Sequence, residues 1–157
     1  MDDGEPHLKH AIALALANVE AGGRPFGAVL VKDGQVVATG VNTVLATHDP
    51  SGHAELNAIR AASAALGSAD LSGCAVYASG HPCPMCMAAM RLAGIGEVAF
   101  AYSNEDGEPH GLSTAAVYAD LARPFAEQSM RIRHLPVRLT DAADPYDAWS
   151  RRQAAQH

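Results

Sequence analysis

The chain has 157 residues, 48% of them hydrophobic and 18% charged, a composition typical of a globular protein with one hydrophobic core. Eleven Lys and Arg residues against 17 Asp and Glu residues give a net charge of −6, opposite in sign to the surface that usually binds nucleic acid. The first apolar run, 11–17, is too short to cross a bilayer and lacks a basic leader. We therefore expect a cytoplasmic protein with a single domain over 1–157 that binds no membrane, and we consider nucleic acid disfavoured as a partner.

The N-terminal part of the chain is predicted to form a helix followed by a hairpin. Apolar residues recur at helical spacing over about 7–21, and Gly22 and Gly23 end this helix. Two β-rich runs, 26–31 and 36–42, are joined by a turn that contains Asp33-Gly34, which is typical of a hairpin. The next stretch, from His53 to about Gly67, is rich in Ala, Leu, Ile and Glu, and it is predicted to be helical.

Strands and helices alternate in the next part of the chain. We expect a buried strand over 74–79, a helix over 84–93 that stops at Gly94, and a strand over 97–102. This alternation predicts βαβ units, with a site beyond the carboxyl ends of the strands, at the turn 79–83. A loop over 103–111, a short helix over 112–121, a last strand over 130–139 and a helix from Asp144 through Trp149 complete the prediction.

Two motifs carry the chemistry, namely His53-Ala54-Glu55 and Pro82-Cys83-Pro84-Met85-Cys86, and both lie at predicted helix starts. Catalytic zinc is held by three protein ligands and keeps a fourth position for water, and His53, Cys83 and Cys86 supply three. Cysteines three residues apart on one helical turn face the same way, and the positive end of a helix favours their thiolate form. A closed structural zinc site or a redox-active cysteine pair would be the alternatives. The third cysteine, Cys74, is expected to be buried in a strand.

Glu55 lies two residues after His53, about 200° around a helix, and is therefore poorly placed to bind the same metal. It is better placed to meet a water bound to the zinc. Zinc lowers the pKa of such a water to about 7, and a carboxylate can accept its proton and pass it to a leaving amine. The two motifs thus predict hydrolytic loss of ammonia, with Glu55 as the proton-transfer residue.

These motifs resemble those of the cytidine deaminase-like superfamily, and the chain is most similar to the small bacterial guanine deaminases within it. The resemblance covers most of the chain and includes Pro25-Phe26-Gly27-Ala28, Val31-Lys32-Asp33-Gly34, Asn42, Leu139-Thr140-Asp141 and Pro145-Tyr146-Asp147-Ala148-Trp149. It implies a three-layer α/β/α sandwich around a five-stranded mixed sheet, and a zinc ion.

The same resemblance implies roles for residues outside the metal motifs. Phe26, Asn42 and the backbone N–H of Ala54 would hold the base. The protein would be a homodimer that exchanges its C-terminal segment, 140–157, and Asp141 would assist proton transfer. From the residues alone, Phe26 could equally belong to the core, and Asn42 could simply cap a strand end.

The chain departs from its relatives at positions expected to shape the pocket. His81 stands where the residue before Pro-Cys is usually Glu, and Leu92 replaces an aromatic on the metal helix. An acid expected later in the chain is replaced by Ser113 or Thr114, and a terminal aromatic by His157. His81 is expected either to line the pocket and contact substrate or to be a solvated loop residue.

The sequence therefore predicts a zinc-dependent aminohydrolase that acts on a free nucleobase or a related heteroaromatic amine. Guanine, converted to xanthine and ammonia, is the first substrate to consider. Isoguanine, cytosine and an amino-s-triazine such as ammeline are alternatives within the class. A tRNA adenosine deaminase shares the motifs but would need a basic surface, and a non-catalytic zinc-binding module is the alternative from another class.

Overall fold

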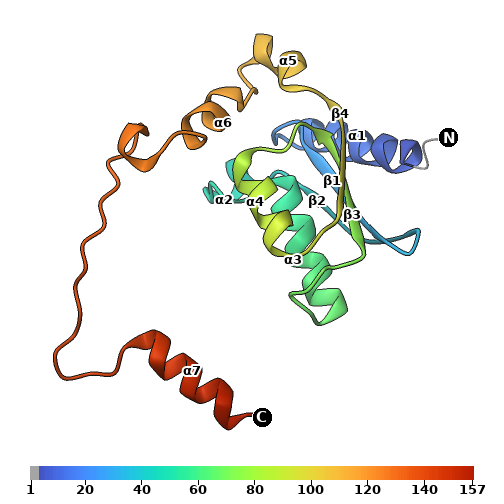
Figure 1. Ribbon diagram of the computed structural model, residues 1–157. Helices are drawn as coiled ribbons and strands as arrows, with labels where there is room; N and C mark the ends of the chain where they lie inside the picture. The colour runs from blue at the N-terminus through green and yellow to red at the C-terminus, as the bar shows by residue number, and fades with distance from the viewer. Residues whose placement is uncertain (1–3) are drawn as a thin grey trace. The chain divides into compact units, whose positions relative to one another are not determined.

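The computed structural model describes residues 4–157, which form two compact units (Figure 1). The first unit, Met1–Ala122, contains a β-sheet with helices on both faces. The second unit, Arg123–His157, contains a short 3-10 helix and a terminal α-helix. Every helix in the described part of the chain is too short or too polar to span a membrane.

The first unit is built on a mixed sheet with the strand order β2-β1-β3-β4. Strand β1 (Gly27–Lys32) pairs antiparallel with both β2 (Gln35–Val41) and β3 (Cys74–Gly80), and β3 pairs in parallel with β4 (Glu97–Tyr102). The predicted hairpin is confirmed, and Asp33 and Gly34 at its turn have positive φ angles of 52° and 75°, which an Asp-Gly turn accommodates. All four predicted strands of this unit are present.

Helices cover both faces of this sheet, which confirms the three-layer α/β/α arrangement (Figure 1). Helix α1 (Glu5–Glu20) packs on one face, where Val29, Val31 and Tyr77 are buried. Helices α3 (Ala54–Leu66) and α4 (Pro84–Leu92) cover the other face, where Leu30 is buried. Because side chains alternate along β1, this one strand contributes to both cores.

The sheet of the described residues has four strands, so the prediction of five is wrong in its count. The missing strand is the one expected over 130–139, which forms no regular structure and lies in the second unit. Its apolar side chains are exposed, 61% at Leu135 and 78% at Val137, and Pro136 between them has no N–H to donate to a ladder. No strand of its own unit is available to pair with it among the described residues.

Two connections of the first unit contain short helices that were not predicted. Helix α2 (Val44–Thr47) was not predicted, and the expected loop after β4 contains α5 (Asn104–Gly107) and the 3-10 helix η1 (Glu108–His110). The helix predicted over 112–121 is α6 (Ala115–Leu121).

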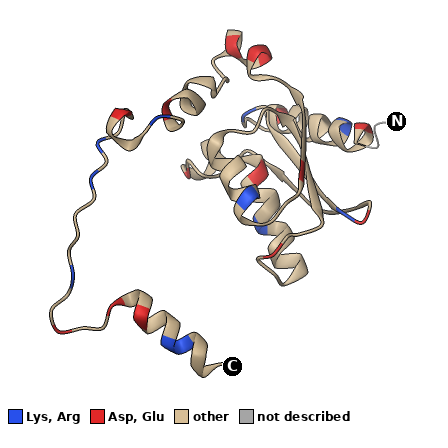
Figure 2. Ribbon diagram, viewed as in Figure 1, with Lys and Arg blue, Asp and Glu red and all other residues tan. Residues whose placement is uncertain are grey.

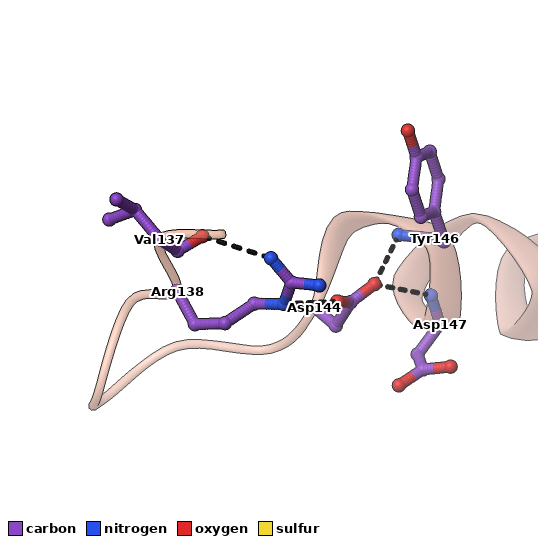
Figure 3. Close-up of polar contacts among 5 residues, drawn as sticks. All are labelled: Val137, Arg138, Asp144, Tyr146 and Asp147. Atoms are coloured by element: carbon purple, nitrogen blue, oxygen red, sulfur yellow. Dashed lines mark hydrogen bonds and ion pairs between the residues drawn. The ribbon is translucent and has the colours of Figure 1, made fainter. Parts of the chain in front are cut away.

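The second unit begins with the 3-10 helix η2 (Phe125–Glu127) and ends with α7 (Pro145–Ala155), which extends beyond the predicted end at Trp149. Asp144 caps α7, because its carboxylate accepts hydrogen bonds from the backbone N–H groups of Tyr146 (2.8 Å) and Asp147 (3.3 Å) (Figure 3). The Arg138 guanidinium lies 4.0 Å from the same carboxylate and donates to the Val137 carbonyl.

The strand directions explain where a site can form in the first unit. Strands β2, β3 and β4 run the same way, opposite to β1, so their carboxyl ends and the start of β1 meet at one edge of the sheet. Phe26 precedes β1 at this edge, Asn42 follows β2, and His81 follows β3. The predicted position of the site, at the turn after β3, is therefore a place where four connections converge.

Candidate metal and substrate site

Three predicted metal ligands come together at the starts of α3 and α4. His53 is the N-cap residue of α3, Cys83 is the N-cap residue of α4, and Cys86 lies in the first turn of α4. Their ligand atoms all lie within 4.8 Å of one another, with His53 Nδ1 3.4 Å from the Cys83 sulfur and 3.6 Å from the Cys86 sulfur. The helix starts thus bring residues 30 positions apart in the sequence to one point.

The donor set fits a zinc ion. One imidazole nitrogen and two sulfurs are donors that zinc prefers, and three protein ligands leave a fourth tetrahedral position free. Cys74 is 3% exposed in the core of β3 and does not belong to this cluster, so among the described residues the set is not closed by the third cysteine. All three cysteines are free thiols rather than a disulfide.

The charges in this cluster also favour a cation. A hydrogen bond from Cys86, together with His53, lowers the pKa of the Cys83 thiol to about 4. The same hydrogen bond and burial raise the pKa of Cys86, because a second thiolate beside the first is unfavourable. A divalent metal ion removes this conflict, since it stabilises both thiolates at once.

Glu55 lies in the first turn of α3 with its side chain 5% exposed. Burial raises its pKa, and a hydrogen bond with Cys86 opposes the increase. The carboxylate is therefore next to the metal cluster but is not one of its members, as the helical geometry predicted. A buried carboxyl group with a raised pKa is well suited to accept a proton and return it.

A pocket of about 170 Å³ opens beside this cluster. Its walls include all four residues expected to contact substrate, together with loop residues from 111–114. The lining residues are Arg24, Phe26, Asn42, His53, Ala54, Glu55, His81, Cys83, Gly111, Leu112, Ser113 and Thr114. The pocket is smaller than the roughly 300–1,000 Å³ typical of sites for drug-sized ligands, so its size suits a single small heteroaromatic molecule.

Asn42 both caps a local turn and faces this pocket, so the two interpretations of this residue are compatible. Its side chain is buried, and its Oδ1 accepts a hydrogen bond from the Val44 N–H at 3.1 Å. Asn18 Nδ2 donates to the Asn42 carbonyl at 2.9 Å and so holds its backbone. Among the described residues, none accepts a hydrogen bond from Asn42 Nδ2, which leaves two N–H donors for a ligand.

His81 is a half-buried residue of the loop after β3 that lines the pocket and packs against aromatic rings, which favours the pocket-lining interpretation. Its ring centroid lies 4.5 Å from that of Phe100 and 5.4 Å from that of Tyr118. Its backbone N–H donates to the Tyr102 carbonyl at 2.8 Å, and the Tyr118 hydroxyl donates to the carbonyl of Pro82. The turn that carries Cys83 is therefore held by β4 on one side and by α6 on the other.

Comparison with known proteins identifies the family. The family model for the cytidine and deoxycytidylate deaminase zinc-binding region matches residues 1–102, which include both chemical motifs. The chain belongs to this family of zinc-dependent deaminases. The matched residues end at the carboxyl end of β4, before the part of the pocket wall that 111–114 form.

Individual relatives of this deaminase agree with that assignment. Guanine deaminase of Bacillus subtilis (strain 168) is 40% identical over 146 residues, which cover 92% of each chain. A tRNA-specific adenosine deaminase of Aquifex aeolicus is 32% identical over 133 residues, 85% of each chain. The crystal structure of the Bacillus subtilis guanine deaminase superimposes with a TM-score of 0.85 and 39% identity, over 96% of this chain and 95% of that one. Guanine deaminase of Nitrosomonas europaea gives a TM-score of 0.66 at 29% identity, over 69% and 64% of the two chains.

Other residues singled out in the sequence lie elsewhere in this deaminase. Leu92 ends α4, is 89% exposed and does not line the pocket, so the expectation that it shapes the pocket is wrong. Asp141 and His157 belong to the second unit, and the Asp141 carboxylate lies 3.5 Å from the Thr140 hydroxyl. Phe26 packs against the core cluster and also lines the pocket, so both interpretations of it apply.

Three residues of the pocket wall were not predicted, namely Arg24, Gly111 and Leu112. They lie in loops, where no hydrophobic period or motif marks a residue as part of a site. Thr114, in contrast, is one of the two candidate positions where the sequence departs from its relatives, and its Oγ1 is the one buried side-chain polar atom of the described residues that has no hydrogen-bond partner.

Proposed function

We propose that this zinc-dependent deaminase acts on a free nucleobase, and that guanine, which it would convert to xanthine and ammonia, is its principal substrate. The observation that carries the proposal is the buried carboxyl group of Glu55 beside the His53, Cys83 and Cys86 donors, in a pocket sized for one base. The similarity to a guanine deaminase over 92% of both chains supports guanine in particular.

His53, Cys83 and Cys86 would hold the zinc ion. When bound, zinc supplies Lewis acidity and lowers the pKa of a water molecule in its open position. Glu55 would accept a proton from the attacking water and deliver it to the ring nitrogen beside C2 as the water oxygen bonds to C2. It would then take the remaining proton of that oxygen and deliver it to the amino group, so that the bond from C2 to the amino nitrogen breaks, a C2 carbonyl forms and ammonia leaves. Water and guanine are thereby consumed, and xanthine and ammonia are released. The raised pKa of Glu55 suits both the uptake and the release of a proton.

Other pocket residues would hold the base during these proton transfers. The Asn42 Nδ2 group donates to an acceptor on the ring, and the first N–H of α3, on Ala54, has no acceptor within its helix and can do the same. Phe26 offers its ring for stacking, and His81, which packs against Phe100, also lines the pocket. These contacts orient the reacting carbon toward the metal ligands.

The alternative substrates remain to be compared by experiment. Isoguanine, cytosine and ammeline would fit a pocket of this size. A tRNA substrate finds support in the 32% identity to a tRNA-specific adenosine deaminase, but the charge of the unit that contains the pocket opposes it (Figure 2). The second unit has six basic and four acidic residues, a net charge of +2, but the first unit, which contains the pocket, has five basic and 13 acidic residues, a net charge of −8. Such a surface would repel an RNA backbone.

The test combines zinc analysis with ammonia release from a panel of free bases, ammeline, nucleosides and tRNA. Wild-type protein is expected to contain about one zinc per chain and to release ammonia from guanine. Glu55→Gln is expected to keep its zinc and to lose nearly all turnover, because the amide cannot transfer the proton. A Glu55→Gln variant that contains zinc and retains turnover would contradict the mechanism. Ammonia release from tRNA and from no other compound of the panel would show that tRNA, not guanine, is the substrate. Protein that contains zinc but releases ammonia from none of them would favour a non-catalytic binding module.

We also propose that the protein is a homodimer that exchanges its C-terminal segment, so that Asp141 acts in the pocket of its partner. The second unit supports this, because its apolar side chains are exposed within one copy, 77% at Leu139 and 62% at Trp149. In the described part of the chain, strand β4 has an unpaired edge with Phe100 and Tyr102 exposed, which an extended segment of a second copy could cover. A cytoplasmic location would suit the three free thiols.

Complementation distinguishes exchange from action within one subunit. Glu55→Gln and Asp141→Asn chains are each expected to be nearly inactive. Mixed after unfolding and refolding, they should recover about a quarter of wild-type turnover, since half of the dimers are mixed and each has one intact site. No recovery, with dimers confirmed by light scattering, would mean that Asp141 does not act across the dimer. A monomer truncated after Thr140 that works normally would exclude both the exchange and any role of Asp141.

A further inference from the structure

We propose that Arg24 determines the specificity of this enzyme by binding the O6 and N7 acceptors of a 6-oxopurine. The inference rests on the proposed function, and it assigns the selection of guanine over other amino-azaheterocycles to a residue outside the deaminase motifs. Arg24 is the one Lys or Arg residue among those that line the pocket. It lies two residues before Phe26, the proposed stacking residue.

The guanidinium of Arg24 is free for a ligand. Within the described part of the chain it donates no hydrogen bond and forms no ion pair. Arg60 differs in this respect, since its guanidinium donates to Asn57 and Ser51. A cation at the wall of a pocket without an acidic partner is available for an acceptor-rich or anionic group of the bound molecule.

The backbone that presents Arg24 is held in place although its side chain is exposed. Asn18 Nδ2 donates to the Arg24 carbonyl at 2.8 Å and to the Asn42 carbonyl at 2.9 Å. The Phe26 N–H donates to the same Arg24 carbonyl at 2.8 Å. The loop is packed closely here, because a Cβ on Gly23 would lie 2.5 Å from Asn18 Nδ2. One side chain thus holds together the loop of Arg24 and the strand end that carries Asn42.

The chemistry of the guanidinium group matches the edge of guanine that does not react. A planar fork of N–H donors binds O6 and N7 of guanine with two hydrogen bonds, the commonest specific contact between a side chain and this base. In guanine the amino group at C2 lies on another side of the ring system from this edge. A base with C2 at the metal ligands therefore keeps O6 and N7 for a residue on the pocket wall. Cytosine and ammeline lack N7, and isoguanine carries an amino donor at position 6.

The test measures kcat and KM for guanine, for 2-aminopurine, which lacks O6, and for 7-deazaguanine, which lacks N7. Arg24→Met is expected to lower kcat/KM for guanine by about 10- to 100-fold, mainly through KM. The two analogues should lose less, so the preference for guanine over each analogue should fall at least about fivefold. Arg24→Lys keeps the positive charge but not the planar fork of N–H donors. It should therefore restore the KM for guanine more than it restores the preference for guanine over the two analogues. Arg91→Met, which removes an exposed arginine of α4 outside the pocket, serves as the control.

Two results would overturn the inference, with zinc content and melting temperature unchanged in each variant. The first is an Arg24→Met enzyme with the wild-type preference for guanine over both analogues. The second is a wild-type enzyme that deaminates nucleoside monophosphates and an Arg24→Met enzyme that has lost this activity but deaminates the free bases normally. Arg24 would then bind a phosphate group rather than the base. If wild-type enzyme releases ammonia from no base, the proposed function fails instead, and the two failures are distinguishable.

Discussion

The contact between β2 and α3 leads to a prediction for Gly40. A Cβ at this position would lie 2.2 Å from the Ala54 carbonyl oxygen, 2.6 Å from the Ala58 nitrogen and 3.2 Å from the Asn57 carbonyl carbon. All three are backbone atoms of α3, so no flexible side chain can move aside. In Gly40→Ala, α3 has to shift by about 1 Å to reach an ordinary van der Waals separation.

The size of the effect follows from what α3 carries. Overpacking lowers the free energy of unfolding by about 1–3 kcal/mol. We expect a loss of about 3 kcal/mol here, because the added Cβ is fixed to the backbone of β2 and meets backbone atoms of α3. For a chain of this length that loss lowers the melting temperature by about 6–12 °C. Ala54 lies between His53 and Glu55, and a displacement of about 1 Å at a reacting group can lower turnover by about 100-fold.

Calorimetry, zinc analysis and ammonia release test this prediction together. Gly96→Ala is the matched control, since a Cβ there meets nothing within 4 Å and its φ lies outside the left-handed region. It should leave turnover unchanged and alter stability by less than about 1 kcal/mol, in the stabilising direction. If Gly40→Ala melts within about 2 °C of wild type and keeps its turnover, α3 is not held against β2 as the structure has it.

Three further predictions concern single features of the molecule. Thr114→Val removes a buried hydroxyl that has no partner and caps no helix, so the melting temperature should stay the same or rise, and a loss of more than about 1 kcal/mol would indicate an undetected hydrogen bond. Removal of zinc by a chelator should lower the melting temperature reversibly, because binding to the folded site adds to stability, and equal melting with and without the metal would refute the three-ligand site. Asp144→Ala should weaken the start of α7 by about 1 kcal/mol, measured as faster hydrogen exchange at Tyr146 and Asp147 with no change in the first unit, whereas unchanged exchange would contradict the cap.

Local signals in the sequence were sufficient for most of the first unit. The hairpin turn was predictable because Asp33-Gly34 tolerates positive φ, and the metal cluster because helix starts place His53, Cys83 and Cys86 where their donors converge. The error at Leu92 could have been avoided by the same helical geometry. Met90 lies on the buried face of α4. Leu92 follows two positions later, about 200° around the helix, and therefore faces solvent.

The strand predicted over 130–139 shows what local signals cannot supply. Its composition favours β structure, but a strand needs a neighbour for its backbone hydrogen bonds, and the second unit has none among the described residues. Whether Leu135 and Val137 enter a sheet thus depends on a strand from outside their own unit rather than on the segment itself. The pocket residues Arg24 and Leu112 were missed for a similar reason, because their place in the wall depends on how loops distant in the sequence meet.

In this pocket, the residues proposed to carry out the reaction are different from those proposed to select the substrate. The proposed metal ligands His53, Cys83 and Cys86 and the buried Glu55 all lie within residues 1–102, which the family model matches, and they require only two helix starts. Part of the wall that contacts the ring lies beyond this region, in 111–114, and Arg24 lies inside it but outside both motifs. Residues of the pocket wall can change without disturbing the metal ligands. A match to the family therefore identifies the reaction, loss of ammonia, more reliably than it identifies the base that reacts. The preference between guanine and its analogues should therefore respond to Arg24 while the zinc content does not.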